Sequence, residues 1–228
     1  MLSGLGYQSV TGSTSAESAG TRSLPALDRL VIAYLTLPLA IFVAGWLQLW
    51  VVVSLLLCLA YSLRPLLSSP ATGAQIISVT RLHLAVAIVV GVAWTVFGGT
   101  AHFVFSNPDW FVRDAVLHDL VVSPWPVGYG VLDGHESILR APVAYYLPAA
   151  LIGKGLGLIA AHLALAAWTA IGASLFLLQV LSLTPSRLTV AMLVATIVVL
   201  FSGLDIIGNL INIGPRFFSI WHIDRHLE

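Results

Sequence analysis

Four long apolar runs constrain this chain more than any other feature. They lie at Leu30–Leu63, Leu82–Phe105, Leu158–Leu183 and Leu188–Leu204. Each run approaches or exceeds the length that an α-helix needs to cross the hydrocarbon core of a membrane. Only 9% of the 228 residues are charged, against about a quarter in soluble domains. The sequence therefore predicts an all-α fold of multi-pass membrane helices.

The basic residues that flank these runs predict the topology. Arg22 and Arg29 precede the first run and place the N-terminus in the cytoplasm by the positive-inside rule. Residues 1–27, rich in Ser, Gly and Thr, are expected to form a disordered cytoplasmic tail. The first run is too long for one span, so we expect it to break near Gly45 and to form a transmembrane hairpin over residues 28–64.

A third span at Leu82–Val104 would deliver a polar interval, residues 105–157, to the non-cytoplasmic face. This interval holds five of the ten acidic residues, which are Asp109, Asp114, Asp119, Asp133 and Glu136. The neighbouring segments carry almost none. We therefore expect function in this long external loop, with amphipathic helices lying on the membrane surface.

Two placements are open for residues 141–152. This segment is apolar, but it is too short for a comfortable span and contains Pro142 and Pro148. It either crosses as a thin transmembrane helix or lies on the outer surface. We favour the surface placement because it puts Arg187 in a cytoplasmic turn. The count is then five spans, and Asp205 reaches the same face as the acidic interval.

The remaining segments predict little chemistry. Residues 209–228 are expected to be external or interfacial. The chain ends at Glu228 without a closing span or a polar tail, as in one part of a longer protein, although a short natural product would look the same. The single cysteine, Cys58, lies in an apolar run and is most simply a core thiol.

A helix is predicted at the start of the polar interval. Asn107, Pro108 and Asp109 form a helix-start signal, and Pro124 ends the helix. The four-residue spacing of apolar side chains predicts a stripe for the membrane surface. Its members are Val112, Val116 and Leu120.

Two charged pairs on this helix could meet at i,i+4 spacing, Asp109 with Arg113 and Asp114 with His118. One interpretation is a solvated amphipathic helix whose charges keep it at the surface. The other is that a partly desolvated carboxylate acts as a general base or metal ligand.

The histidines give weaker signals. His83, His102 and His162 lie in or at the ends of spans, where polar groups are often functional. A neutral histidine hydrogen-bonded between helices is the simpler interpretation of each. The segment Asp133-Gly134-His135-Glu136 could bind a metal, but one turn supplies few ligands, and we expect a mobile polar loop.

The polar interval resembles the first external loop of GT-C-type membrane glycosyltransferases. In that family the loop opens with a catalytic acidic residue. The matching residues follow in the same order, namely Asp109, Arg113, Ala115, Asp119, Leu120, Trp125 and Pro126, and then Arg140, Pro142, Tyr145, Tyr146, Lys154 and Gly157. Asp205 lies where the family has a later acidic residue, so the resemblance covers residues 82–208. The chain departs from the pattern at Trp110, where a second acid is usual, and in the hairpin that precedes the module.

The resemblance implies an enzyme of the plasma (inner) membrane. It would transfer a sugar from a polyprenyl-phosphate donor to a lipid, polysaccharide or protein acceptor on the non-cytoplasmic face. Asp109 would be the catalytic base. Its supporting residues would be Asp114, His118 and Asp205.

The resemblance also implies how the donor is bound. The lipid phosphate would be neutralised by basic side chains, namely Arg113, Arg140, Lys154 and Arg216, since guanidinium groups suit phosphate oxygens. Each of these residues could instead be an interfacial anchor. Asp109 and Asp205 would hold a divalent metal such as Mg²⁺ or Mn²⁺.

A different class of function fits the same sequence. The chain could be a non-catalytic membrane subunit or scaffold of a cell-envelope assembly complex, bound to a partner membrane subunit. A transporter is less favoured because the spans lack buried charge pairs and broken helices. Membrane lipids are expected partners, and no nucleic acid is expected.

Overall fold

The computed structural model describes residues 26–68, 79–100, 102, 109–132, 135–201 and 211. These residues are mostly helical. The α-helices are α1 (Ala26–Trp46), α2 (Leu49–Ser68), α3 (Arg81–Phe97), α4 (Asp109–Val122), α5 (Leu147–Leu156), α6 (Leu158–Leu181) and α7 (Leu188–Phe201). A short antiparallel hairpin, β1 (Gly128–Leu132) with β2 (His135–Ile138), and a 3₁₀ turn, η1 (Val143–Tyr145), connect α4 to α5.

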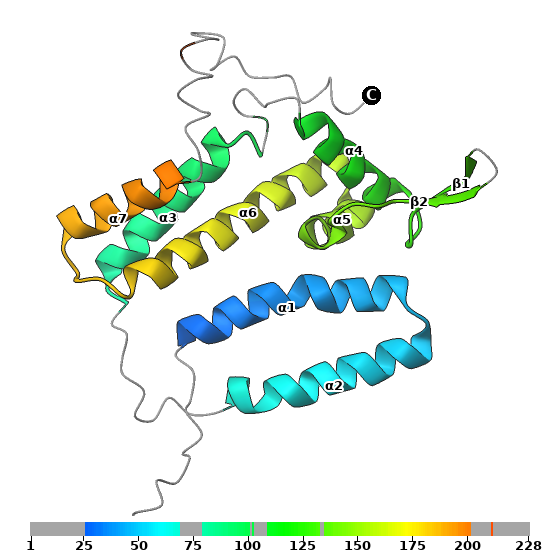
Figure 1. Cartoon of the computed structure of the whole chain (residues 1–228), viewed down its shortest axis with the longest axis horizontal. Coiled ribbons are helices and arrows are strands. Elements are labelled where there is room, and N and C mark those ends of the chain that lie inside the picture. The colour runs from blue at the N-terminus through cyan, green and yellow to red at the C-terminus, as the bar shows by residue number, and fades with distance from the viewer. Residues whose placement is uncertain are drawn as a thin grey trace, which may run out of the picture.

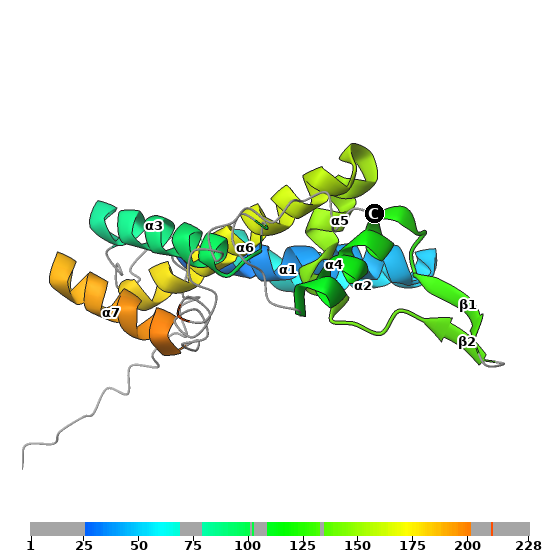
Figure 2. The ribbon, with the colours of Figure 1, turned by 90° about the horizontal axis from the view of Figure 1, so that it is seen from above.

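Helix α6 is the element around which the others are arranged. Helix α3 lies beside it, α7 joins them near the C-terminal end of α6, and α4 and α5 cover its N-terminal end (Figure 1). Helix α1 contacts α6 through Tyr34, whose ring stacks on Trp168 at 4.0 Å and whose hydroxyl donates to the Trp168 carbonyl at 3.1 Å. Figure 2 shows the β1–β2 hairpin projecting away from the helices.

Two helices, α1 and α6, are long and apolar enough to cross a membrane. This confirms the coarse prediction of a helical protein with membrane-length segments. The predicted break in the first apolar run is also confirmed, because α1 ends at Trp46 and α2 begins at Leu49.

Helix α2 is apolar but little buried. It packs mainly against α1, and Leu49, Trp50 and Tyr61 are each more than 70% exposed. Cys58 is exposed on this helix, so the expected core thiol is wrong. The apolar run at residues 30–63 thus predicted the helix correctly, but it did not indicate whether the side chains of α2 are buried within the protein.

Helix α3 is shorter than predicted. Thr80 caps its start by accepting a hydrogen bond from the His83 amide at 3.2 Å. The helix ends at Phe97 rather than continuing to Val104, because the chain turns at Gly98 and Gly99. Gly99 has a φ of 81°, a left-handed backbone that glycine adopts readily.

The buried face of α4 differs from the predicted stripe. The helix begins at Asp109 and ends at Val122, just before Pro124, as expected. Val116 and Leu120 are buried, but Val112 is 68% exposed. The face that enters the core instead follows Trp110, Asp114, Leu117 and Leu120, a three- and four-residue spacing close to the helical period.

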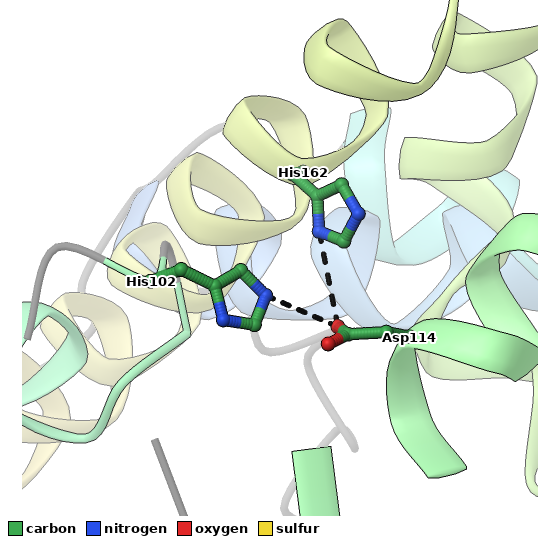
Figure 3. Close-up of side chains that lie close together, drawn as sticks. All are labelled: His102, Asp114 and His162. Carbon is green, nitrogen blue, oxygen red and sulfur yellow. Dashed lines mark hydrogen bonds and ion pairs between the residues drawn. The ribbon is translucent and has the colours of Figure 1, made fainter. Parts of the chain in front are cut away.

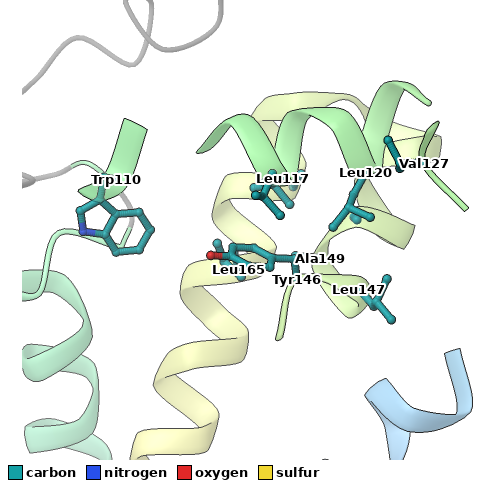
Figure 4. Close-up of a cluster of buried hydrophobic side chains, with 11 residues drawn as sticks. Trp110, Leu117, Leu120, Val127, Tyr146, Leu147, Ala149 and Leu165 are labelled. Carbon is teal, nitrogen blue, oxygen red and sulfur yellow. The ribbon is translucent and has the colours of Figure 1, made fainter. Parts of the chain in front are cut away.

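The core under α4 joins this helix to α5 and α6. Leu117 and Leu120 lie against Tyr146, Ala149 and Leu165 (Figure 4). Gly153 allows the close approach of the three helices. A Cβ atom at this position would lie 2.6 Å from the Ala161 side chain and 2.7 Å from Val121.

The polar segment 133–136 is not a simple loop. His135 and Glu136 belong to strand β2, where they pair with Leu132 and Val131 of β1, while Asp133 and Gly134 lie outside the described residues. The all-α prediction is therefore incomplete. A strand pair this short carries no apolar alternation long enough to be recognised in a sequence.

The surface segment predicted at 141–152 is also shifted. It opens with η1, and helix α5 begins only at Leu147, with Pro148 in its first turn, and continues to Leu156. Proline is well tolerated at the first helical positions. Gly157, at a φ of 89°, separates α5 from α6.

Candidate functional site

Three buried polar side chains meet where α4 packs against α6. The Asp114 Oδ1 atom lies 3.1 Å from His102 Nε2 and 3.9 Å from His162 Nδ1 (Figure 3). His102 is 1% exposed, Asp114 6% and His162 5%. A buried carboxylate is costly unless charge or hydrogen bonds compensate it, so this cluster is the most unusual polar feature of the described residues.

Each member of the cluster comes from a different element. Asp114 lies on the buried face of α4, and His162 lies in the second turn of α6, just after the Gly157 break. His102 follows the turn that ends α3 and has a φ of 56°. This left-handed backbone is uncommon for a residue with a side chain and often marks a functional or tightly constrained position.

Ring contacts also hold the cluster together. The His102 ring packs edge-on against Trp110, with 5.6 Å between the ring centres, and edge-on against His162, with 5.2 Å between the ring centres. Trp110, in the first turn of α4, is itself only 3% exposed. The dry surroundings strengthen every electrostatic interaction within the cluster.

The predicted base, Asp109, lies elsewhere on α4. Asp109 and Arg113 are both exposed, and the Arg113 guanidinium lies over the Trp110 ring at 5.0 Å from its centre. Asp109 belongs to no group of three or more metal-ligand side chains within the described residues. Asp205, the second ligand of the Mg²⁺ or Mn²⁺ site that the resemblance implied, lies outside the described residues, so that site stays a prediction.

The expected pairing of Asp114 with His118 is replaced by other contacts. Asp114 points into the protein, whereas His118 is exposed and its Nδ1 atom lies 3.4 Å from Asp119 Oδ1. Asp119 also accepts a 2.5 Å hydrogen bond from the Tyr129 hydroxyl. This bond is the largest cause that raises the Tyr129 pKa to about 12.

The basic residues expected to bind phosphate lie on separate segments wherever the structure describes them. Lys154 Nζ donates to the Ser123 carbonyl at 2.6 Å and lies 5.1 Å from the centre of the Trp125 ring. It thereby ties α5 to the C-terminal end of α4, where a cation is favourable. Arg140 is exposed, and both Asp205 and Arg216 lie outside the described residues.

An apolar cavity of about 460 Å³ lies between α1, α3, α6 and η1. Its walls are mostly aromatic and small side chains, namely Tyr34, Trp94, Thr95, Gly98, Thr100, Tyr145, Thr169, Gly172, Ala173 and Phe176. Thr100 lies two positions before His102 in the chain. The cavity and the polar cluster therefore belong to neighbouring parts of the protein.

The hydroxyl groups of Tyr145, which lines the cavity, and of its neighbour Tyr146 have raised pKa values. Burial raises the pKa of Tyr145, while its 2.5 Å hydrogen bond with Thr169 and the positive charge of Arg113 act in the opposite direction. Burial likewise raises the pKa of Tyr146, again with Arg113 opposing it. The positive charge of Arg113 therefore lowers the pKa of Tyr145, the residue of this pair that lines the cavity, although burial outweighs it.

No family model, curated protein or solved structure matches this chain.

Proposed function

We propose that this protein is an integral membrane glycosyltransferase that uses a polyprenyl-phosphate sugar as donor. The apolar cavity between α1, α3, α6 and η1 is the observation that carries the proposal. Tyr145 lines it, and the charge of Arg113 acts on Tyr145. An apolar cavity with a cation near one side suits an isoprenoid chain that ends in a phosphate.

The proposed chemistry is a direct displacement at the anomeric carbon. The Asp109 carboxylate takes the proton of the acceptor hydroxyl or amine as the new bond to the sugar forms. The bond between the anomeric carbon and the phosphate oxygen breaks, and the polyprenyl phosphate leaves as an anion. Asp109 is exposed on the first turn of α4, where an acceptor can reach it.

In this proposal α1 and α6 cross the plasma membrane, with the shorter helices α2, α3 and α7 completing five spans. The N-terminus is cytoplasmic, and α4, α5 and the β1–β2 hairpin lie on the opposite face. Supporting this arrangement, the charged residues of the described chain gather on and around α4, while α1 and α6 contain few.

The test is transfer from radiolabelled polyprenyl-phosphate sugars by the full chain in reconstituted vesicles. Asp109→Asn should lower the rate by about 100-fold or more, the usual effect of losing a general base. Asp119→Asn is the matched control, because it makes the same change on the same helix. Equal transfer by wild type and Asp109→Asn would remove Asp109 from the mechanism.

The second candidate is a non-catalytic membrane subunit, and the exposed apolar surface of α2 favours it. Leu49, Trp50 and Tyr61 there could face lipid or the helix of a partner. Failure of the wild-type protein to transfer any of several donors, together with co-purification of one membrane partner that Leu49→Ser and Trp50→Ser release, would support this function over the enzyme.

A further inference from the structure

We infer that His102, Asp114 and His162 bind a divalent transition-metal ion, with Zn²⁺ as the best fit. This site differs from the Mg²⁺ or Mn²⁺ site expected at Asp109 and Asp205. It is also independent of the proposed transferase activity, because it depends only on the geometry and chemistry of three described side chains.

The donor atoms select the class of metal. Two imidazole nitrogens and one carboxylate oxygen form a ligand set that suits Zn²⁺ and similar first-row ions. Mg²⁺ and Ca²⁺ prefer ligand sets made of oxygen atoms. Among the described residues, these three side chains are the only group of this kind that could hold a metal.

The spacing of the donor atoms is close to what such an ion requires. Tetrahedral ligands at about 2.0–2.1 Å from zinc lie about 3.3 Å from one another. Here Asp114 Oδ1 lies 3.1 Å from His102 Nε2 and 3.9 Å from His162 Nδ1, and one donor atom of each residue can be chosen so that all lie within 4.8 Å of one another. Small side-chain rotations would bring the widest pair into range.

Because the three side chains are buried, a metal ion would interact with them more strongly than it would with the same groups in water. All three side chains are more than nine-tenths buried, so solvent screens their charges weakly. The left-handed backbone of His102 directs its ring toward Asp114 across the space between α3 and α4. A metal here would fasten α4 to the end of α3 and to α6, so its loss should loosen this end of the protein.

The first experiment measures metal binding by the purified full chain, from which any affinity tag has been cleaved. After chelator treatment, the protein is titrated with Zn²⁺ and, separately, with Co²⁺ and Mg²⁺. We expect one Zn²⁺ per chain, visible absorption bands of tetrahedral Co²⁺ with nitrogen and oxygen ligands, and no comparable binding of Mg²⁺. Zn²⁺ should also raise the melting temperature.

Each variant replaces an imidazole ligand by a neutral amide, which is not among the usual ligands of Zn²⁺. His102→Gln and His162→Asn should weaken Zn²⁺ binding by about 100-fold or more, because loss of outer-shell partners alone costs 10- to 100-fold. Zn²⁺ should then no longer raise their melting temperature. His118→Gln, an exposed histidine on α4, should bind Zn²⁺ as the wild type does.

Two results would overturn the inference. One is wild-type protein that binds no Zn²⁺ at micromolar concentration and shows no tetrahedral Co²⁺ spectrum, which would leave a metal-free ion pair. The other is equal Zn²⁺ binding by folded His102→Gln and wild type, which would place the metal elsewhere. If both variants unfold, the test is the Co²⁺ spectrum of the wild type: tetrahedral bands with nitrogen and oxygen ligands support the site, and their absence overturns it.

Discussion

The two ends of α6 are packed in different ways. At its N-terminal end, α4 and α5 cover it with large side chains such as Leu117, Leu120 and Tyr146, beside the His–Asp–His cluster. At its C-terminal end, α3 and α7 pack through leucines and small residues, including Ala87, Ala191 and Ala195. One end resembles a protein core with a buried polar site, and the other resembles the packing of membrane helices.

This difference teaches where the chain can build a specific site. Helices that pack through small residues approach one another closely, and His83, a buried polar side chain on α3, belongs to no group of three or more metal-ligand side chains among the described residues. The short helix α4 instead lies over the N-terminal end of α6 and buries aromatic, aliphatic and acidic side chains there, namely Trp110, Leu117 and Asp114. The two ends should therefore respond differently to substitutions, and the following experiments test this from the largest expected effect to the smallest.

The largest effect is expected from Leu117→Ala. Leu117 is fully buried under α4, so truncation should lower the free energy of unfolding by about 3 kcal/mol, as in other buried leucines. Val112→Ala, on the exposed side of the same helix, should change it by less than about 0.5 kcal/mol. Chemical unfolding in detergent measures both.

Hydrogen exchange on Leu117→Ala then tests the comparison itself. Faster exchange should be confined to α4, α5 and the first turns of α6, because these elements share one core. Equally faster exchange in α3 and α7 would mean that the two ends form one cooperative unit.

A moderate effect is expected from Gly91→Ala at the other end. The new Cβ atom would lie 2.8 Å from the Ser174 backbone nitrogen and 3.0 Å from its Cα, so α3 and α6 must separate. This should cost about 2 kcal/mol. Gly155→Ala is the matched control, since no atom of the described residues lies within 4 Å of its added Cβ. Equal stabilities of these two variants would show that the α3–α6 contact is not close-packed.

The smallest effect is a shift in titration without loss of the fold. The hydrogen bond to Asp119 is the main cause of the Tyr129 pKa of about 12, so Asp119→Asn should return this pKa toward 10.0. Because the folded pKa is raised, the stabilisation from this bond is present below pH 10.0 and lost as the pH rises toward about 12. Tyrosinate absorbance, compared between wild type and variant, measures the shift. An unchanged titration curve would contradict this assignment.

The sequence predicted the helical segments well and the polar site poorly. Long apolar runs report helix and membrane compatibility directly, so the break at Trp46, the start of α6 and the end of α4 before Pro124 were all predictable. The β1–β2 hairpin was not, because its strands are too short to show alternation. The resemblance to membrane glycosyltransferases points to Asp109, an exposed acid at the start of α4, rather than to the buried Asp114.

The cluster beneath α4 was the harder case. From the sequence, His102 and His162 look like separate histidines and Asp114 like a supporting residue, because nothing local connects positions on three elements. One signal was available: Asp114 shares a helical face with Trp110 and Leu117, and an acid on an apolar face suggests a buried partner.

The amino-acid sequence alone determined which segments are helical and apolar, because periodicity and length are local properties. Only the tertiary structure decided that the turn after α3, the buried face of α4 and the start of α6 meet. That meeting depends on the left-handed turn at His102 and on the close approach that Gly153 permits between α4, α5 and α6. Such long-range packing follows from the shapes of many side chains at once and leaves no local pattern in the chain.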